Sequence, residues 1–243
     1  MINMLTKRTS LWNWLSLVAM GILMLMIFFY APTERTMGYV QRIFYFHVGT
    51  AWVAAVTFFV ALVAGIMYLW KRWDNADLVS LASVEIGVAF VTMTIASGAI
   101  WGKPAWNTWW VWSPRLTSIT ILWLVYIAYF ILRSAIDNDE TRKRFSAVYV
   151  IAGFVTVIIT YSSIRILRDI HPVMFGSSLE SAQGMEQGLQ EFSGLDSTRM
   201  NQTLLVAVVA FSILYVAWMA NRIKFEHMRS KLNSVRMRVL ASE

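Results

Sequence analysis

Cysteine is absent from this chain of 243 residues, and only three histidines are present. Without a thiol, the protein cannot perform thiol–disulfide exchange, and it cannot bind a cofactor through a thioether bond from its own residues. A P-loop is also missing from the sequence, so we expect no ATPase activity of the chain's own. Whether the protein is an enzyme of another kind stays open.

Charged residues are scarce as well, at 14% of the chain against 58% hydrophobic residues, and the mean hydropathy is +0.55. This composition is typical of a protein whose solvent is lipid. A transmembrane helix needs roughly 20 mostly apolar residues. Six such runs occur, at residues 11–30, 48–70, 79–100, 116–132, 145–164 and 203–220. We therefore predict an all-α integral membrane protein, a six-transmembrane-helix bundle that forms a single membrane domain over residues 1–243.

The basic residues predict the orientation of the chain. If the N-terminus lies inside, 14 of the 21 Lys and Arg residues fall on the inner side, which satisfies the positive-inside rule. We expect both termini, including the basic tail 221–243, to be cytoplasmic. The net charge of +7 then reflects sidedness in a lipid bilayer, and no nucleic-acid partner is expected. Parity requires the connections after the first, third and fifth spans to share the outer face.

The connection after the third span is unusually rich in tryptophan. Residues 101–118 read WGKPAWNTWWVWSPRLTS and hold five of the twelve tryptophans, namely Trp101, Trp106, Trp109, Trp110 and Trp112. One interpretation is an aromatic belt, because tryptophan favours the headgroup level of a membrane. The other is a flat aromatic shelf for a planar apolar ligand, with Lys103 and Arg115 facing its anionic groups. A porphyrin with propionates fits the second interpretation.

Two of the three histidines, His47 and His171, are expected on the same outer face, near the ends of the second and fifth spans. Neutral imidazole is a common axial ligand of haem iron, and two such groups from different helices can close both faces of one macrocycle. Either histidine alone is more often a hydrogen-bonding residue. Together with the tryptophan run, they predict a pair of axial ligands.

These residues resemble the WWD-domain family of cytochrome c biogenesis, which includes CcmC, CcmF and CcsA, and most closely its haem exporter protein C (CcmC) branch. The likeness covers residues 39–220. Its parts are HVGTA from His47, the run WGKPAW, WWVW and RLT between Trp101 and Thr117, and a histidine after the fifth span.

The resemblance implies a function, a cofactor, partners and a location. His47 and His171 would be the axial ligands of a non-covalent haem b, and the 101–118 segment would form the haem platform on the periplasmic side of a bacterial inner membrane. Haem would pass to a periplasmic haem chaperone of the CcmE type. An ABC-type ATPase (CcmA-like) and membrane subunits (CcmB- and CcmD-like) would be further partners.

Two positions depart from the family's pattern. Asn107 stands where the family usually has Gly, and Ser113 stands where it has the Asp of its WWD motif. Ser113 precedes Pro114, and Ser at the N-cap with Pro at the first helical position is a favourable helix start. We hypothesise that the family's Asp serves chiefly as a helix cap, which Ser replaces.

Other features leave rival functions open. Glu85 lies inside the third span, where a charge is costly and marks either a functional residue or polar packing. An alternative function is a haem or small-amphiphile transport permease, which would need polar residues along a route through the bundle. Glu85 is the only obvious ionisable residue for such a route, so the support for this alternative is weak. The outer segment 171–202 is acidic and either covers a site, meets a partner or merely links spans. A membrane cytochrome and a purely structural assembly subunit are further alternatives.

Overall fold

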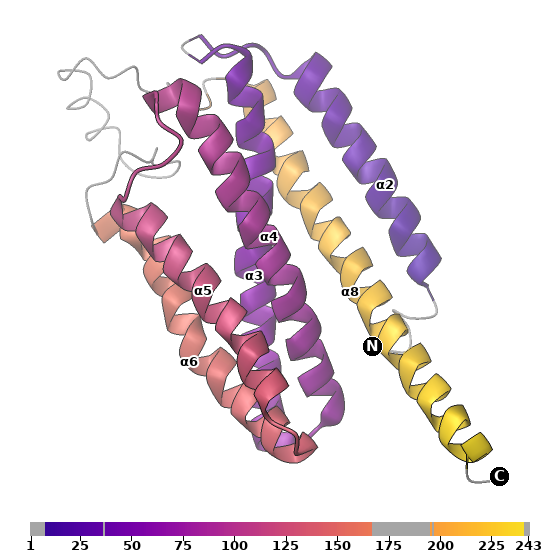
Figure 1. Cartoon of the computed structure of the whole chain (residues 1–243). Coiled ribbons are helices and arrows are strands. Elements are labelled where there is room, and N and C mark those ends of the chain that lie inside the picture. Colours follow the sequence, from indigo (N-terminus) through magenta and orange to yellow (C-terminus); the bar gives the residue numbers. More distant parts are fainter. Residues whose placement is uncertain (1–7, 36, 167–194, 196, 241–243) are drawn as a thin grey trace.

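The computed structural model describes residues 8–35, 37–166, 195 and 197–240. The described residues include six helices that are long and apolar enough to cross a membrane (Figure 1), so the predicted fold class is confirmed. They are α2 (Thr9–Leu25, continued by the π-helical turn Met26–Tyr30), α3 (Arg42–Lys71, preceded by the 3-10 turn Tyr39–Gln41), α4 (Asp74–Trp106), α5 (Pro114–Ala135), α6 (Asp139–Ile166) and α8 (Thr198–Leu240).

Most of these helices are longer than the apolar runs that predict them. Hydropathy identifies only the residues that favour the hydrocarbon layer of the membrane. Backbone hydrogen bonds continue a helix beyond them into the membrane–water interface. Helix α4 continues through Pro104 as far as Trp106, and α8 continues unbroken through the basic tail to Leu240. The tail is therefore not a separate helix but an extension of the sixth span.

Helix α3 is the centre of the bundle and contacts α4, α6 and α8. Helix α2 packs on α8, and α5 packs mainly on α6. Glycines of α3 and α4 allow α3 to approach α8, α6 and α4 closely. An added Cβ would lie 2.3 Å from Phe211 at Gly49, 2.7 Å from Val150 at Gly65, and 2.6 Å from Thr57 at Gly87. Small residues at such crossings are typical of packed membrane helices.

Aromatic side chains fill the core between these helices. Phe58 of α3 stacks on Tyr126 of α5, with ring centroids 3.8 Å apart, and both side chains are buried. Large apolar side chains such as Leu17 and Phe29 are exposed on the outside of the bundle. An exposed apolar surface on a six-helix bundle is what a lipid environment requires.

The bundle has two distinct ends, and successive connections alternate between them. The chain passes from α2 to α3 and from α4 to α5 at one end, where α6 also finishes and α8 begins (Figure 1). We call it the tryptophan end because residues 101–113 lie there. The opposite end, here the terminal end, holds Thr9, Leu240 and the connections from α3 to α4 and from α5 to α6.

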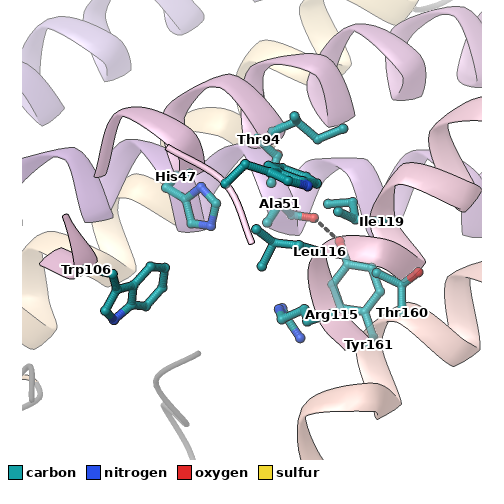
Figure 2. A pocket seen from close by; sticks show the side chains of 12 residues that line it. His47, Ala51, Thr94, Trp106, Arg115, Leu116, Ile119, Thr160 and Tyr161 are labelled. Carbon is teal, nitrogen blue, oxygen red and sulfur yellow. Dashed lines mark hydrogen bonds between the residues drawn. The ribbon is translucent and has the colours of Figure 1, made fainter. Parts of the chain in front are cut away.

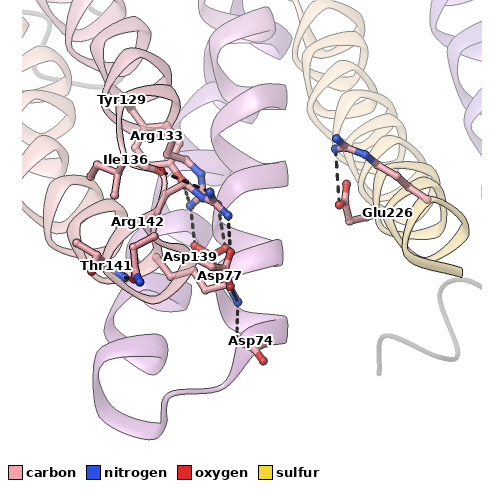
Figure 3. Close-up of polar contacts among 12 residues, drawn as sticks. Asp74, Asp77, Tyr129, Arg133, Ile136, Asp139, Thr141, Arg142 and Glu226 are labelled. Carbon is pink, nitrogen blue, oxygen red and sulfur yellow. Dashed lines mark hydrogen bonds and ion pairs between the residues drawn. The ribbon is translucent and has the colours of Figure 1, made fainter. Parts of the chain in front are cut away.

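Ion pairs join the helices near the terminal end (Figure 3). Arg133 of α5 donates to both carboxylate oxygens of Asp77 on α4, at 2.6 and 3.0 Å, and both side chains are almost buried. Lys143 of α6 lies 2.9 Å from an Asp74 oxygen and 2.6 Å from an Asp139 oxygen. The pairs with Asp77 and Asp74 tie the hairpin of α5 and α6 to α4, whereas the pair of Lys143 with Asp139 lies within α6.

Glu85 also belongs to an ion pair. Its carboxylate accepts from Nε and Nη2 of Arg222 on α8, at 2.5 and 3.0 Å, and Arg222 also contacts Glu226 at 2.9 Å. Pairing with a cation relieves the cost of a carboxylate within a span. In this structure Glu85 therefore joins α4 to the start of the basic tail.

Candidate functional site

A cavity lies near the tryptophan end, between α3, α4, α5 and α6 (Figure 2). It contains about 530 Å³ of empty space, counting the open space at its mouth. Its wall is formed by His47, Ala51, Thr94, Ile95, Gly98, Trp106, Trp110, Arg115, Leu116, Ile119, Thr160 and Tyr161. The lining is mainly apolar and aromatic, with few polar groups, as is usual for a pocket that binds an organic ligand.

His47 reaches this wall from the second turn of α3. Its Nδ1 lies 3.1 Å from the hydroxyl oxygen of Ser97 on α4. The ring also lies close to the α4 backbone, because a Cβ on Gly98 would be only 3.0 Å from its Cε1. Sequence reasoning missed Thr94, Ser97 and Gly98. The available signal was a set of small residues recurring at three- and four-residue intervals within an apolar span.

The five tryptophans of the 101–118 segment take different positions. Trp106 and Trp110 line the cavity. Trp101 is buried behind Trp106, with ring centroids 5.1 Å apart, and Trp112 packs on Trp110 at 5.8 Å. Trp109 and Trp112 are 58% and 73% exposed. The segment thus places two indoles on the wall.

The indoles do not form the single flat shelf that the sequence led us to expect. Trp101 and Trp106 meet at an interplanar angle of 90°, and Trp110 and Trp112 meet at 81°. Indole rings have negative faces and positive edges, so neighbouring rings favour edge-to-face contact over a coplanar arrangement. Each cavity-lining indole is instead supported edgewise by a neighbour.

Lys103 does not line the cavity. Its ammonium donates to the backbone carbonyl of Asn107 at 3.0 Å and to the Asn107 side-chain oxygen at 3.2 Å. Asn107 ends α4 in the left-handed region, with φ of 55°. Asn tolerates this conformation better than other residues with a Cβ, which explains how it replaces the family's Gly. Lys103 and Asn107 together fix the end of α4, from which the chain continues to Trp109 and Trp110.

Arg115 does line the cavity, and the cap of α5 positions it. The Ser113 hydroxyl accepts a hydrogen bond from the Leu116 amide at 3.4 Å, with Pro114 at the first helical position. The predicted N-cap is therefore confirmed. It directs the first turn of α5, including Arg115, toward the cavity. Tyr161 of α6 closes the wall nearby, and its hydroxyl donates to the Ala51 carbonyl.

His171 and most of the acidic segment 171–202 lie outside the described residues, so the predicted pairing of His47 with His171 stays a prediction. The third histidine, His227, lies on the α8 extension and does not line the cavity.

The residues present fit a haem better than a bare metal ion. Within the described residues, no group of three or more His, Asp or Glu side chains is able to hold a metal ion. Iron that arrives within a porphyrin needs only axial ligands from the protein. The cavity offers one imidazole, indole surface for a macrocycle and the Arg115 guanidinium for a carboxylate.

Comparisons with known proteins agree with this assignment. Three relatives are similar over much of their length. "Heme exporter protein C" of Rhodobacter capsulatus is 29% identical over 212 residues, covering 87% of this chain and 83% of its own. The protein of the same name in Bradyrhizobium diazoefficiens is 30% identical over 237 residues, covering 96% and 84%. A "putative cytochrome c biosynthesis ccmC-like mitochondrial protein" of Marchantia polymorpha is 28% identical over 153 residues, covering 61% and 64%.

The family model described as "CcmC: Heme exporter protein C" matches residues 1–238, almost the whole chain. With a multi-pass helical bundle, an imidazole-bearing cavity and the tryptophan segment at one end, this chain belongs to the heme exporter protein C (CcmC) family.

Proposed function

We propose that this protein binds haem b without a covalent bond in the cavity at the tryptophan end and presents it for the maturation of c-type cytochromes. The observation that carries the proposal is the meeting of His47, Trp106, Trp110 and Arg115 on one cavity wall. His47 comes from α3, and the other three residues come from the 101–118 segment. The names of the relatives, which refer to heme export and to cytochrome c biosynthesis, support the same role.

In this proposal each side chain has a distinct task. His47 supplies one axial nitrogen to the iron and His171 supplies the other, while Arg115 binds a propionate. Trp106 and Trp110 exclude water from the macrocycle by covering it with apolar surface. Because the chain has no cysteine, nothing in it forms a thioether, and the haem stays transferable. The bound iron contributes affinity through its axial sites.

Release follows from the same ligand set. Exchange of one imidazole for a ligand from a partner lowers the affinity and leaves the rest of the cavity in place. The partner that fits is a periplasmic haem chaperone of the CcmE type, with an ABC-type ATPase of the CcmA type and CcmB- and CcmD-like membrane subunits nearby. The tryptophan end would then face the periplasm from a bacterial inner membrane.

The visible spectrum of the purified protein tests the ligand pair. The wild type is expected to show a Soret band with the α and β bands of low-spin haem, and His47→Ala and His171→Ala are each expected to lose that low-spin spectrum. His227→Ala is the matched control, because this histidine lies on the extension of α8 and its removal is expected to leave the spectrum unchanged.

Retention of the wild-type spectrum in His47→Ala would contradict the proposal. An equal loss of the low-spin spectrum in His227→Ala would also contradict it, because the loss would then come from a disturbed fold and not from a change in the cavity. The permease alternative makes a different prediction, since it places function at Glu85. That carboxylate is paired with Arg222 in the structure, and we expect Glu85→Gln to leave the spectrum intact.

A further inference from the structure

His47 has a specific neighbour on α4. Its Nδ1 lies 3.1 Å from the Ser97 hydroxyl oxygen, and the same oxygen lies 3.2 Å from the Thr94 backbone carbonyl. Both Ser97 and Thr94 are buried. The contact therefore forms inside the bundle, where hydrogen-bonding partners are few and a lost bond is costly.

The number of protons decides the direction of these hydrogen bonds. A serine hydroxyl has one proton to donate, and a carbonyl oxygen only accepts. Ser97 donates its proton to the Thr94 carbonyl, so its oxygen meets the imidazole as an acceptor. The tautomer that matches this arrangement carries the ring proton on the His47 Nδ1. In the neutral ring this arrangement puts the lone pair on Nε2.

The neighbouring Gly98 fixes where the ring lies. A Cβ built on Gly98 would be 3.0 Å from Cε1, 3.5 Å from Nδ1 and 4.0 Å from Nε2 of His47. A contact of 3.0 Å is tighter than ordinary carbon contacts, so a Cβ at position 98 would require the imidazole to move by a few tenths of an ångström. Ser97 and Gly98 thus act on the same ring, one through a hydrogen bond and the other through its lack of a Cβ.

We infer that Ser97 and Gly98 are positioning residues that hold His47 as the Nδ1–H tautomer and give Nε2 to the iron. The part concerning iron rests on the proposed function, whereas the tautomer is a property of the haem-free protein. Metal-binding histidines generally donate their second nitrogen to an oxygen acceptor, which orients the ring and increases its basicity. A more basic imidazole binds ferric iron more tightly and lowers the midpoint potential of the haem.

The tautomer is measured directly in the haem-free protein. Nitrogen-15 spectra of histidine-labelled protein in detergent, recorded at about pH 8 where an unperturbed imidazole is neutral, distinguish a protonated nitrogen from an unprotonated one. The His47 signals are assigned by their loss in His47→Ala. We expect a protonated Nδ1 and an unprotonated Nε2. A ring protonated mainly at Nε2 would overturn the inference, whatever the protein does with haem.

Variants of Ser97 test its effect on the ligand. Ser97→Ala is expected to weaken the binding of added ferric haem by roughly tenfold and to raise its midpoint potential, while Ser97→Thr, which keeps the hydroxyl, restores both. Ser163→Ala is the matched control. Ser163 is also buried and donates to a carbonyl three residues earlier, at 2.8 Å, but it lies on α6, and the hydroxyl 3.1 Å from His47 Nδ1 is that of Ser97. Equal effects of Ser97→Ala and Ser163→Ala would refute a specific role for Ser97.

Gly98 is tested by adding the single Cβ that the structure leaves out. Gly98→Ala is expected to shift the Soret band and lower haem affinity, because the imidazole has to move away from α4. Gly21→Ala on α2, where an added Cβ meets nothing within 4 Å, is expected to bind haem as the wild type does. An unchanged spectrum in Gly98→Ala would show that Gly98 does not position His47.

The two proposals fail in different ways. If the wild type binds no haem and the nitrogen-15 spectra still show Nδ1–H, the proposed function is wrong and the tautomer assignment stands. If haem binds through His47 and the proton lies on Nε2, the function stands and the role of Ser97 is lost.

Discussion

Ser113 is a residue at which the chain departs from its family and the structure shows what the side chain does. Its hydroxyl caps α5 by accepting from the Leu116 amide. We expect Ser113→Ala to lower the free energy of unfolding by about 1 kcal/mol, the usual cost of losing a cap, and to lower haem occupancy because Arg115 follows two residues later. Denaturation monitored by circular dichroism, together with haem content after purification, measures both effects.

Ser113→Asp separates capping from charge. A carboxylate caps a helix as well as a hydroxyl does, so this variant is expected to match the wild type in stability and in haem occupancy. A large gain in occupancy with Asp would show that the charge of the family's residue contributes to binding, and capping would then be an incomplete account of that position.

The sequence revealed some residues of the site and concealed others. His47, Arg115 and the tryptophan run were recognisable because rare residue types gathered at the ends of apolar spans. Ser97, Gly98 and Tyr161 were not recognised, because their roles depend on how α4 and α6 are rotated against α3. Hydropathy does not encode that rotation. Lys103 was assigned to the ligand for its charge, but the structure shows it bonded to the end of its own helix.

The packing of whole helices depends on glycines that let backbones approach. At Gly65 an added Cβ would lie 2.7 Å from Val150 and 3.2 Å from the backbone carbonyl of Ala147 on α6. We expect Gly65→Ala to destabilise the bundle by roughly 1–3 kcal/mol, since the backbone of α6 has no room to yield without shifting the whole helix. Unfolding in mixed detergent measures the difference.

Gly153→Ala is the control for this helix crossing. Gly153 lies on α6, and an added Cβ there would meet Val125 at 3.4 Å, an ordinary contact distance. A stability close to that of the wild type is expected. If both alanine variants lost equal stability, the cause would lie in the helices themselves and the crossing of α3 with α6 would not be responsible.

At the scale of elements, the six spans could be predicted because each is a long apolar run. Their ends could not, because hydrogen bonding continues a helix past the residues that need lipid. Pro104 was a natural place to end α4, yet the helix passes through it and stops only where Asn107 adopts a left-handed conformation. Pro104 has no amide proton and so gives up one helical hydrogen bond, while the turn after it places Trp106 against Trp101.

For the whole molecule, the absence of cysteine makes the orientation measurable with single introduced thiols. Thr33 and Asp137 are exposed on opposite ends of the bundle, between α2 and α3 and between α5 and α6. In spheroplasts, we expect Thr33→Cys to react with a membrane-impermeant maleimide, and Asp137→Cys to react only after permeabilisation. The reverse pattern would put the cavity on the cytoplasmic side and contradict delivery to a periplasmic partner.

The unbroken α8 has a mechanical consequence. Its 43 residues give a rod about 65 Å long, at 1.5 Å per residue, which is roughly twice the thickness of the hydrocarbon layer. The part beyond the bilayer extends from the level of Arg222, whose ion pair with Glu85 ties α8 to α4. Toward its other end the same helix carries Phe211, which contacts Gly49, two residues along α3 from His47. One continuous helix therefore links the surface beyond the bilayer to a residue next to the cavity wall.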